Sequence, residues 1–220
     1  MEAVLFDMDG TLLDTLQDLD TSVNHALAKA GLPAVSMDET RRAAGYGSIV
    51  LIDELTHHAF PTGSEAFAAV LDCFSRHYNA HHDDATRPYD GIMELLEGLS
   101  SRGLKMAVVS NKIQKDTEQL RELYFSRYID VAIGRRDDVA PKPAPDMAQA
   151  ACELLGVQPA SCCYVGDSEP DVQLARNAGC MSVGCTWGFR SCDVLAAENP
   201  DYLIEHPLQL LDIVDALERG

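Results

Sequence analysis

Six short runs of apolar residues recur along the chain, and each ends in a polar or glycine-containing turn. Continuous apolar character, rather than alternation, is typical of strands that are covered on both faces. We therefore predict a strand at each run: Ala3–Phe6, Met106–Val109, Val131–Ile133, Cys162–Val165, Met181–Gly184 and Tyr202–Ile204.

Between these runs the apolar residues follow helical spacing. In the segment Ile92–Leu99 they repeat at i, i+3, i+4 and i+7, and Gly103 follows where a helix C-terminal cap would stand. Similar patterns lead to Gly156 and to Gly179, and another ends the chain. Strands that alternate with helices predict an α/β fold with a Rossmann-like parallel sheet and right-handed crossovers.

One long segment breaks the alternation. From Asp14 to about Asp84 no strand is predicted, and apolar residues line helix faces in Leu16–Leu27 and Phe67–Tyr78. Ser36 and Glu39 form a capping-box pattern that predicts the start of a further helix. We therefore expect an α/β core domain of residues 1–13 and 86–220, with an α-helical cap domain of residues 14–85 inserted after the first strand.

Composition narrows the class of protein. The chain has 220 residues, 46% hydrophobic and 24% charged, which is typical of a globular domain with a buried core. No apolar run reaches the ~18 residues of a membrane span, and the first residues enter a strand pattern without a signal peptide. The seven cysteines contain no C-x-x-C pair and are expected to be reduced thiols in the cytoplasm.

The net charge of -18 excludes nucleic acid as a partner, because phosphate backbones are bound by Lys and Arg. A small anionic substrate would need a local positive centre, from a metal ion or a placed lysine. No membrane partner is expected, and the sequence leaves both a monomer and a homodimer open.

Polar residues gather where the predicted strands end. In open parallel sheets, ligands bind outside the carboxyl ends of the strands. The residues at or near these ends are Asp7, Asp9, Gly10, Thr11, Ser110, Asn111, Lys142, Gly166, Asp167, Ser168 and Asp171. We therefore expect several acids, a lysine and a hydroxyl to converge on one edge of the sheet.

Carboxylates crowded at one edge repel one another unless a cation lies among them. Oxygen ligands of this kind select Mg²⁺, which takes one or two carboxylates and keeps water or phosphate oxygens as its other ligands. The metal and Lys142 would supply the positive centre that the net charge lacks.

The ordered motifs D7-M-D-G-T11, S110-N, K142-P and G166-D-S-x-x-D171 resemble those of the haloacid dehalogenase-like hydrolase superfamily. The helical insertion after the first motif resembles that superfamily's first type of cap. The stretches VVSNK, DDVAPKPAPD, GDSEPDVQLARNAG and TWGFR resemble its phosphoglycolate phosphatase group most. The resemblance covers nearly the whole chain and implies a phosphatase acting on a small phosphorylated metabolite, with phosphoglycolate the first candidate.

The resemblance also implies a role for each acid of the first motif. Asp7 would be the nucleophile that attacks phosphorus and forms an aspartyl-phosphate. Asp9 would be the general acid that protonates the leaving oxygen and then the base that activates water.

Further roles follow from the same resemblance. Lys142 and Ser110 would hold the phosphoryl oxygens, with Thr11 and Asn111 supporting the phosphate site. The metal ligands would be Asp7, the backbone carbonyl of Asp9, and Asp167. Ser168 and Asp171 would support this site from behind, and Asp171 would orient Lys142 or a metal-bound water.

The stretch R41-R-A-A-G-Y-G47 resembles the substrate loop of the family's cap and makes residues 41–47 the candidates for substrate choice. Gly45 and Gly47, which flank Tyr46, permit close backbone approach to a ligand. Arg41 or Arg42 would bind a substrate carboxylate as a bidentate pair, or both are solvated helix charges.

Two further sets of residues have alternative interpretations. His77 and His81 lie four apart on a predicted helix, which is either a two-ligand metal face or a pair of exposed histidines. Trp187 and Arg190 follow the fifth predicted strand, and they either pack the loop or touch substrate.

Other activities of the same superfamily stay open to different degrees. A phosphosugar mutase would carry a histidine four residues beyond Thr15, where this chain has Leu19. A pyrophosphatase or a nucleotidase uses the same frame. A dehalogenase attacks carbon and needs neither a metal nor the acid at Asp9.

Two classes outside these hydrolases also form an aspartyl-phosphate. A signalling receiver domain would be a binding switch, but the acid at position 9 and the large insertion argue against it. An ATP-driven ion pump shares the phosphorylation chemistry, but the sequence has no membrane spans.

Overall fold

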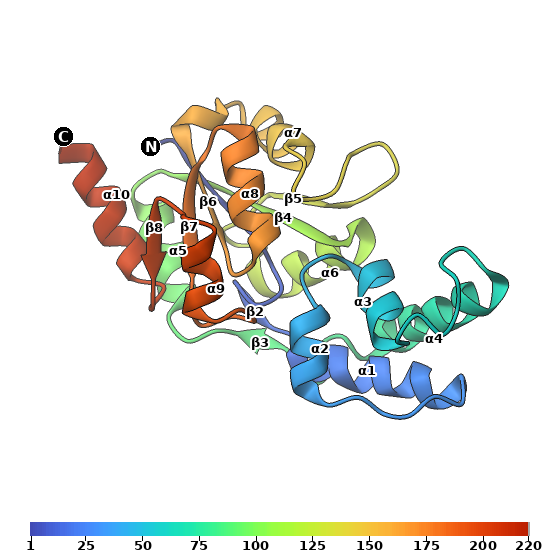
Figure 1. Ribbon diagram of the computed structural model, residues 1–220. Helices are drawn as coiled ribbons and strands as arrows, with labels where there is room; N and C mark the ends of the chain where they lie inside the picture. The colour runs from blue at the N-terminus through green and yellow to red at the C-terminus, as the bar shows by residue number, and fades with distance from the viewer. Residues whose placement is uncertain (220) are drawn as a thin grey trace. The chain divides into compact units, whose positions relative to one another are not determined.

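The computed structural model describes residues 1–219, which form two compact units (Figure 1). The first unit, the core unit, contains Met1–Leu13 and the chain from Pro88 onward, and the second, the inserted unit, contains Asp14–Arg87. The predicted return to the core, between residues 85 and 86, lies two residues before the observed one.

A six-stranded sheet forms the centre of the core unit, and every pairing between its strands is parallel. The spatial order of the strands is β5-β4-β1-β6-β7-β8. Their bounds are β1 Ala3–Phe6, β4 Lys105–Ile113, β5 Val131–Arg135, β6 Cys162–Gly166, β7 Met181–Cys185 and β8 Tyr202–Ile204. The strands after β1 extend the sheet first on one side of β1 and then on the other, so β1 marks the topological switch point where ligands bind.

All six predicted strands are present, and the α/β fold with a Rossmann-like parallel sheet is confirmed. The runs Ala3–Phe6 and Tyr202–Ile204 match their strands residue for residue, and the other four strands extend beyond their apolar runs. The largest difference is in β4, where the predicted run stopped at Val109. Pairing with β5 continues to Ile113 after a register shift, so Ser110 and Asn111 lie within an irregular strand end and not after it.

The sheet has one hydrophobic core on each face, which explains why its strands are apolar without alternation. Along β1, Val4 and Phe6 join one core, while Ala3 and Leu5 join the other. The first core includes residues of the helices α5 (Ile92–Ser101), α6 (Gln114–Phe125) and α10 (Gln209–Arg219). The second includes residues of α7 (Asp146–Leu155) and α8 (Glu169–Ala178).

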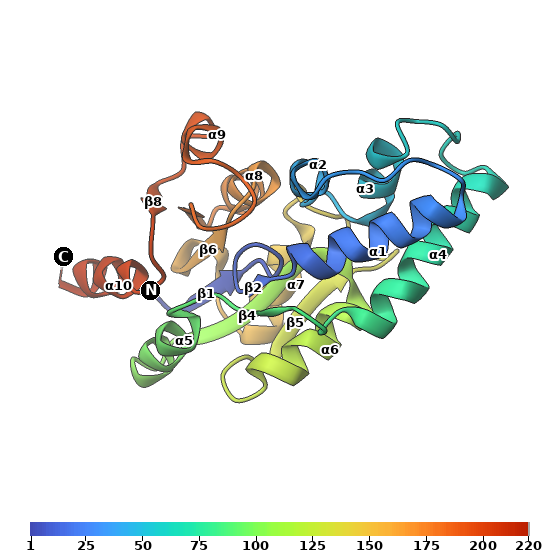
Figure 2. The same ribbon diagram turned by 90° about the horizontal axis from the view of Figure 1, so that it is seen from below.

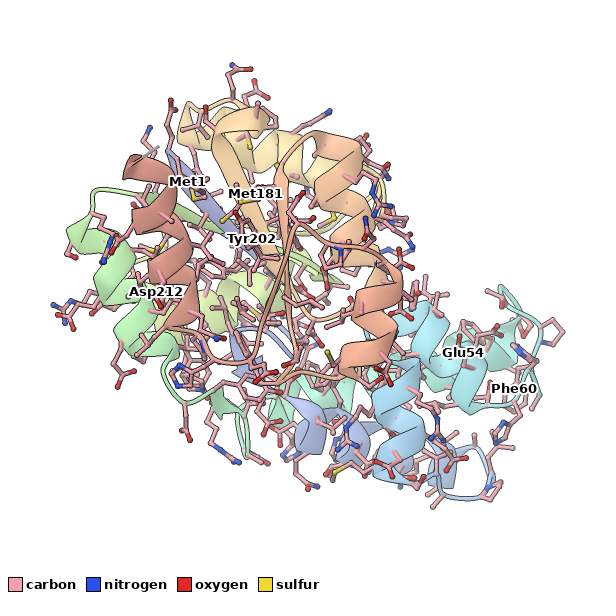
Figure 3. The ribbon with its side chains drawn as sticks, turned by 60° about the vertical axis from the view of Figure 1, so that its left-hand side comes forward. Met1, Glu54, Phe60, Met181, Tyr202 and Asp212 are labelled. Atoms are coloured by element: carbon pink, nitrogen blue, oxygen red, sulfur yellow. The ribbon has the colours of Figure 1, made fainter. Side chains whose placement is uncertain are left out.

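The remaining elements of the core unit are short. They are the 3₁₀ turn η1 (Pro159–Ser161) and the helix α9 (Cys192–Ala197). Helices α5 and α10 lie side by side in both ribbon views (Figures 1 and 2). Met1 and Met181, labelled in Figure 3, pack against the first core, and Tyr202 begins β8.

Glycine ends two core helices where the sequence predicted it. Gly156 caps α7 with φ 66° and Gly179 caps α8 with φ 79°, a left-handed conformation that glycine adopts without a Cβ penalty. After each of these glycines the chain leaves the helix and continues toward the next strand of the sheet.

The inserted unit contains four helices: α1 (Leu16–Lys29), α2 (Met37–Ala43), α3 (Ser48–Leu55) and α4 (Glu65–His81). The capping box between Ser36 and Glu39 at the start of α2 is confirmed. The sequence did not predict α3. The chain enters and leaves the unit through a two-stranded sheet of β2 (Leu13–Asp14) and β3 (Arg87–Pro88).

Among the described residues, no helix combines the length and the apolar character that crossing a membrane requires.

A buried carboxylate fixes the C-terminal end of the inserted unit to its first helix. Asp18 of α1 is 4% exposed and accepts hydrogen bonds from the backbone N–H of Ala85 and Thr86. The Thr86 hydroxyl also donates to Asp18, over 2.7 Å. Without this acceptor, three donors of residues 85 and 86 would lose their partner.

We expect Asp18→Ala to lower the free energy of unfolding by about 3 kcal/mol, because each buried donor left unsatisfied costs roughly 1–3 kcal/mol. Urea denaturation measures this difference. The matched control is Asp83→Ala at an exposed position of the same unit, which should change stability by less than about 0.5 kcal/mol. Equal effects of the two substitutions would contradict the role of Asp18.

Candidate active site

The loop after β1 is folded tightly around the first pair of aspartates. The backbone N–H of Asp7 donates to Val165 O of β6 over 2.9 Å, which continues the sheet by one residue. The Met8 carbonyl then accepts from the N–H groups of Thr11, Leu12 and Leu13. This turn places Asp7 and Asp9 at the carboxyl edge of the sheet, beside the switch point.

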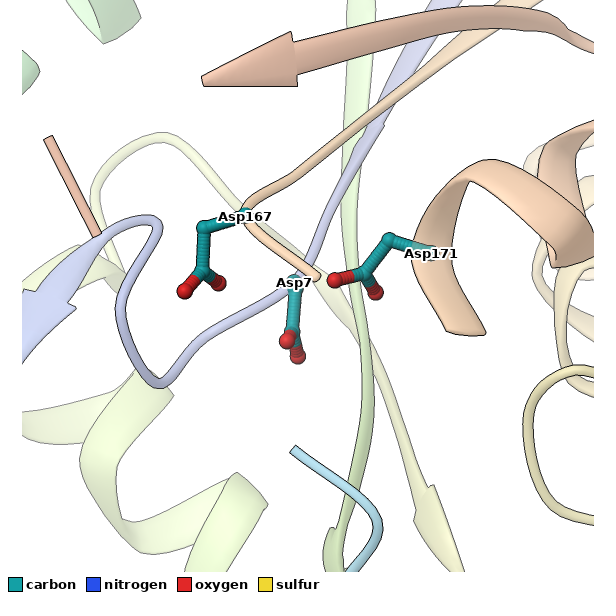
Figure 4. Close-up of side chains that lie close together, drawn as sticks. All are labelled: Asp7, Asp167 and Asp171. Atoms are coloured by element: carbon teal, nitrogen blue, oxygen red, sulfur yellow. The ribbon is translucent and has the colours of Figure 1, made fainter. Parts of the chain in front are cut away.

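Three aspartates from different parts of the core unit meet at this edge (Figure 4). Asp7 follows β1, Asp167 follows β6, and Asp171 lies in the first turn of α8. One carboxylate oxygen of each lies within 4.8 Å of those of the other two, and the residues are 3%, 1% and 1% exposed. Among the described residues, this is the one group of acids, histidines or cysteines with spacing suited to a metal ion.

Lys142 lies between two of these acids. Its ammonium Nζ is 2.6 Å from Asp171 Oδ1 and 2.9 Å from Asp7 Oδ1. It also donates to the hydroxyl of Tyr164, which in turn donates to the Val109 carbonyl over 2.7 Å. The lysine is therefore held by β6 and α8 as well as by the nucleophile candidate.

The backbone around Lys142 is fixed by Asn111. The Asn111 side chain accepts from the N–H of Lys142 over 2.9 Å and donates to its carbonyl over 3.4 Å. Asn111 therefore links β4 to the Lys142 loop, and its support of a phosphate site stays a prediction. Ser110, directly before it, is buried and accepts from the N–H of Lys112 over 3.4 Å.

Asp171 and Ser168 support one another at the start of α8. They form a capping box, in which the Ser168 N–H donates to Asp171 Oδ2 over 3.0 Å and its hydroxyl donates to the same oxygen. Asp171 thus joins the helix cap to Lys142, and its role in orienting Lys142 or a metal-bound water stays a prediction.

Asp167 accepts hydrogen bonds from two donors, and two glycines pack closely against it. It accepts from the Thr11 hydroxyl over 3.0 Å and from the Phe189 N–H over 2.7 Å. A Cβ at Gly10, where φ is 79°, would lie 2.3 Å from Asp167 Oδ2, and one at Gly188 would lie 2.4 Å from Asp167 Cβ. The hydroxyl of Thr11 supports Asp167 in this structure, and its expected contact with the phosphate stays a prediction.

Burial and crowding shape the protonation of these groups. Burial, followed by the neighbouring charges of Asp171 and Asp9, raises the pKa of Asp7 to about 7 against the opposing effect of Lys142. Burial and the same kind of crowding by Asp171 and Asp7 raise the pKa of Asp167 well above its usual range. For Lys142, burial opposes the charge, but Asp171 and Asp7 outweigh it and raise its pKa.

The donor set fits a hard divalent cation. With all three aspartates ionised, as metal ligands must be, the acids would carry -3 and Lys142 +1, a net charge of -2. A cation of charge +2 would balance it and remove the repulsion that raises the pKa of Asp7 and Asp167. Buried carboxylate oxygens are the ligands that Mg²⁺ prefers.

Asp9 lies outside this cluster and has a lysine of its own. The Asp9 carboxylate Oδ2 is 3.2 Å from Nζ of Lys112, which is in the last part of β4. Lys112 was not among the predicted site residues. The signal in the sequence was its position directly after S110-N in the stretch VVSNK.

The predicted loop residues of the inserted unit lie at the end of α2 and before α3. Arg41 pairs with Asp38 at 2.5 Å, and Arg42 is exposed. Gly45 has φ 105° and Gly47 has φ 88°, so both need the freedom of glycine, and Tyr46 between them is exposed. The role of residues 41–47 in choosing a substrate stays a prediction.

The predicted histidine pair is part of a larger group. His77 Nδ1 lies 3.0 Å from the Ser22 hydroxyl, and its ring stacks on that of His25 with a centroid distance of 4.1 Å. His81 is exposed and its Nδ1 is 2.8 Å from Asp84 Oδ2. Among the described residues these groups do not form a three-ligand metal cluster.

Trp187 and Arg190 make contacts that hold the loop after β7. The indole N–H of Trp187 donates to the Thr11 carbonyl over 3.0 Å. The guanidinium of Arg190 pairs with Glu169 of α8 at 2.8 Å. The Trp187 contact joins the β7 loop to the first motif, and the Arg190 contact joins it to α8. Both are packing contacts, and contact of either residue with substrate stays a prediction.

We expect Gly188→Ala to lower activity at least about tenfold, because the added methyl group must displace Asp167 or the Gly10 carbonyl, 2.3 Å away. Turnover should fall, and metal affinity, measured by calorimetry, should fall with it. The control Gly103→Ala adds a methyl group where nothing lies within 4 Å and φ is 74°. It should cost about 1 kcal/mol of stability and leave turnover unchanged. Normal turnover by folded Gly188→Ala would contradict this geometry.

Comparison with known proteins supports the arrangement of the core unit. The family described as "Haloacid dehalogenase-like hydrolase" matches residues 4–185. The chain is 30% identical over 216 residues to a phosphoglycolate phosphatase of Aquifex aeolicus, covering 98% of this chain and 97% of the relative. It is 33% identical over 214 residues to one of Xanthomonas campestris, covering 94% of each.

A crystal structure from Lactobacillus delbrueckii subsp. bulgaricus is similar along its whole length. That protein, described as a candidate phosphoglycolate phosphatase, has a TM-score of 0.89 and 31% sequence identity to this chain. The likeness covers 97% of this chain and 98% of the other. The sequence comparison and the structure comparison therefore point to the same group of proteins.

Proposed function

The chain belongs to the haloacid dehalogenase-like hydrolase family and is a hydrolase of phosphoric monoesters, and from this premise we propose that it is a Mg²⁺-dependent phosphatase acting through an aspartyl-phosphate on Asp7. The observation that carries the proposal is the meeting of Asp7, Asp167 and Lys142 at the switch point of the sheet. A nucleophile, a metal-ligand set and a fixed positive charge are the parts that phosphoryl transfer requires.

In the first step, a carboxylate oxygen of Asp7 attacks phosphorus and the bond from phosphorus to the ester oxygen breaks. Asp9 donates a proton to that oxygen, so the product leaves as an alcohol. In the second step, Asp9 takes a proton from water, which attacks phosphorus and releases phosphate with Asp7 restored. Asp9 is therefore protonated again at the end of the cycle and can act as the acid in the next one.

The fixed groups would stabilise the charge that moves during both steps. Lys142, buried and anchored by Asp171, would hold a phosphoryl oxygen without having to reorganise, and the Ser110 hydroxyl would hold another. Asp7, the carbonyl of Asp9, and Asp167 would hold Mg²⁺, which when bound would offset the negative charge of the phosphoryl group.

We propose a small phosphorylated metabolite as the substrate, with 2-phosphoglycolate the first candidate, because the relatives named above carry that activity in their names. A mutase is disfavoured, since the position where its histidine would stand is Leu19, which is buried in α1.

All seven cysteines are free thiols, which supports a cytoplasmic location.

We expect phosphate release from one member of a substrate panel with Mg²⁺, and at least about a hundredfold less with chelator, because the metal balances the buried acids. The panel contains 2-phosphoglycolate, sugar phosphates, nucleotides and pyrophosphate. Malachite-green detection of phosphate makes the measurement. Release that is indifferent to chelator would reject the metal-dependent mechanism, and the absence of release from every member would reject the assigned substrate class.

We expect Asp7→Asn to lose at least about 10⁴-fold in turnover, since an amide is a poor nucleophile. Its melting temperature should not fall, because the substitution removes one charge from a crowded buried cluster. The control Asp193→Asn, at an exposed position of α9, should retain full turnover. Substantial turnover by folded Asp7→Asn would remove Asp7 from the nucleophile's role.

A further inference from the structure

The two acids of the first motif are each paired with a different lysine. Lys142 lies against Asp7 and Asp171, while Lys112 lies against Asp9 with 3.2 Å between Nζ and Oδ2. The Lys112 side chain is 6% exposed. In a chain with a net charge of -18, a largely buried lysine placed against this aspartate at the sheet edge calls for an explanation beyond bulk charge balance.

The local structure shows how Lys112 is presented to Asp9. Pairing between β4 and β5 is regular to Val109 and resumes at Ile113, after a register shift. Lys112 lies in this irregular stretch, where its N–H donates to the Ser110 hydroxyl and its carbonyl accepts from the Thr117 hydroxyl. Irregular strand ends of this kind re-aim side chains near active sites.

As a general acid, Asp9 needs a fixed side-chain orientation. A general acid must align with the leaving oxygen to transfer its proton, and an aspartate side chain that no contact holds samples several rotamers. A carboxylate held through one oxygen can still exchange a proton through the other. The ammonium at Oδ2 therefore restricts the rotation of the Asp9 side chain.

We propose that Lys112 is the positioning residue for the general acid and base, holding the Asp9 carboxylate through Oδ2 in the orientation that faces the leaving oxygen. This inference rests on the proposed function and extends it to a residue outside the four motifs. Lys142 and Lys112 then divide the work, one fixing the nucleophile's surroundings and the other fixing the proton donor.

The test compares substrates that differ in their need for a general acid. Ethyl phosphate and 2-phosphoglycolate release an alkoxide oxygen that must be protonated, whereas 4-nitrophenyl phosphate releases a stable phenolate. For Lys112→Met we expect kcat/KM to fall about 10- to 100-fold on both alkyl phosphates and less than about threefold on 4-nitrophenyl phosphate. Lys112→Arg should recover part of the loss, and the exposed control Lys115→Met should match the unmodified protein on all three substrates.

A double-mutant comparison gives an independent readout. If Lys112 acts through Asp9, Lys112→Met introduced into Asp9→Asn should cause no further loss on ethyl phosphate. Thermal unfolding of each variant shows whether it is folded, and Lys112→Gln, which keeps a hydrogen-bond donor, replaces Lys112→Met if that variant does not fold.

Three results would overturn the positioning role. They are equal losses on all three substrates, a loss confined to 2-phosphoglycolate, which would assign Lys112 to the substrate carboxylate, and additive losses in the double variant. Unmodified protein that hydrolyses none of the substrates would reject the proposed function and this inference together. Normal hydrolysis by the unmodified protein with normal Lys112→Met rejects the inference alone.

Discussion

The buried ion pair between Lys142 and Asp171 joins the separate chain segments that form the candidate active site at the sheet edge. Lys142 comes from a loop that Asn111 ties to β4, and Asp171 belongs to the first turn of α8. The same ammonium reaches Asp7 after β1. Removing one partner of a buried pair leaves an uncompensated charge, so the three segments are held in a single arrangement.

Around this pair, like charges are kept close by geometry and not by mutual attraction. Burial and neighbouring carboxylates raise the pKa of both Asp7 and Asp167, so the cluster stores repulsion that a divalent cation would relieve. The glycines at positions 10 and 188 let the surrounding backbone approach Asp167 closely. These close approaches keep the three acids within reach of one another.

The sequence predicted the strands and the acids because both leave local signals. An apolar run covered on both faces marks a strand such as Ala3–Phe6, and a polar residue at its end marks the sheet's ligand-binding edge. The helix α3 was missed because Ile49–Ile52 is continuously apolar without helical spacing and Gly47 before it offers no capping side chain. Lys112 was missed although it directly follows S110-N, because its partner Asp9 lies about a hundred residues earlier in the chain, and Gly188 was missed because only the fold brings it against Asp167.

The paired strands β2 and β3 have a consequence for how such a molecule changes over time. They bring residues 13–14 and 87–88 together, so the whole inserted unit begins and ends at neighbouring points of the chain's path. The 74 residues of the inserted unit form one long connection within the chain of the core unit. Lengthening such a connection costs little in closure entropy. The insertion can therefore change in length and sequence, or be exchanged for another, while the strands and the buried acids of the core sheet keep their arrangement.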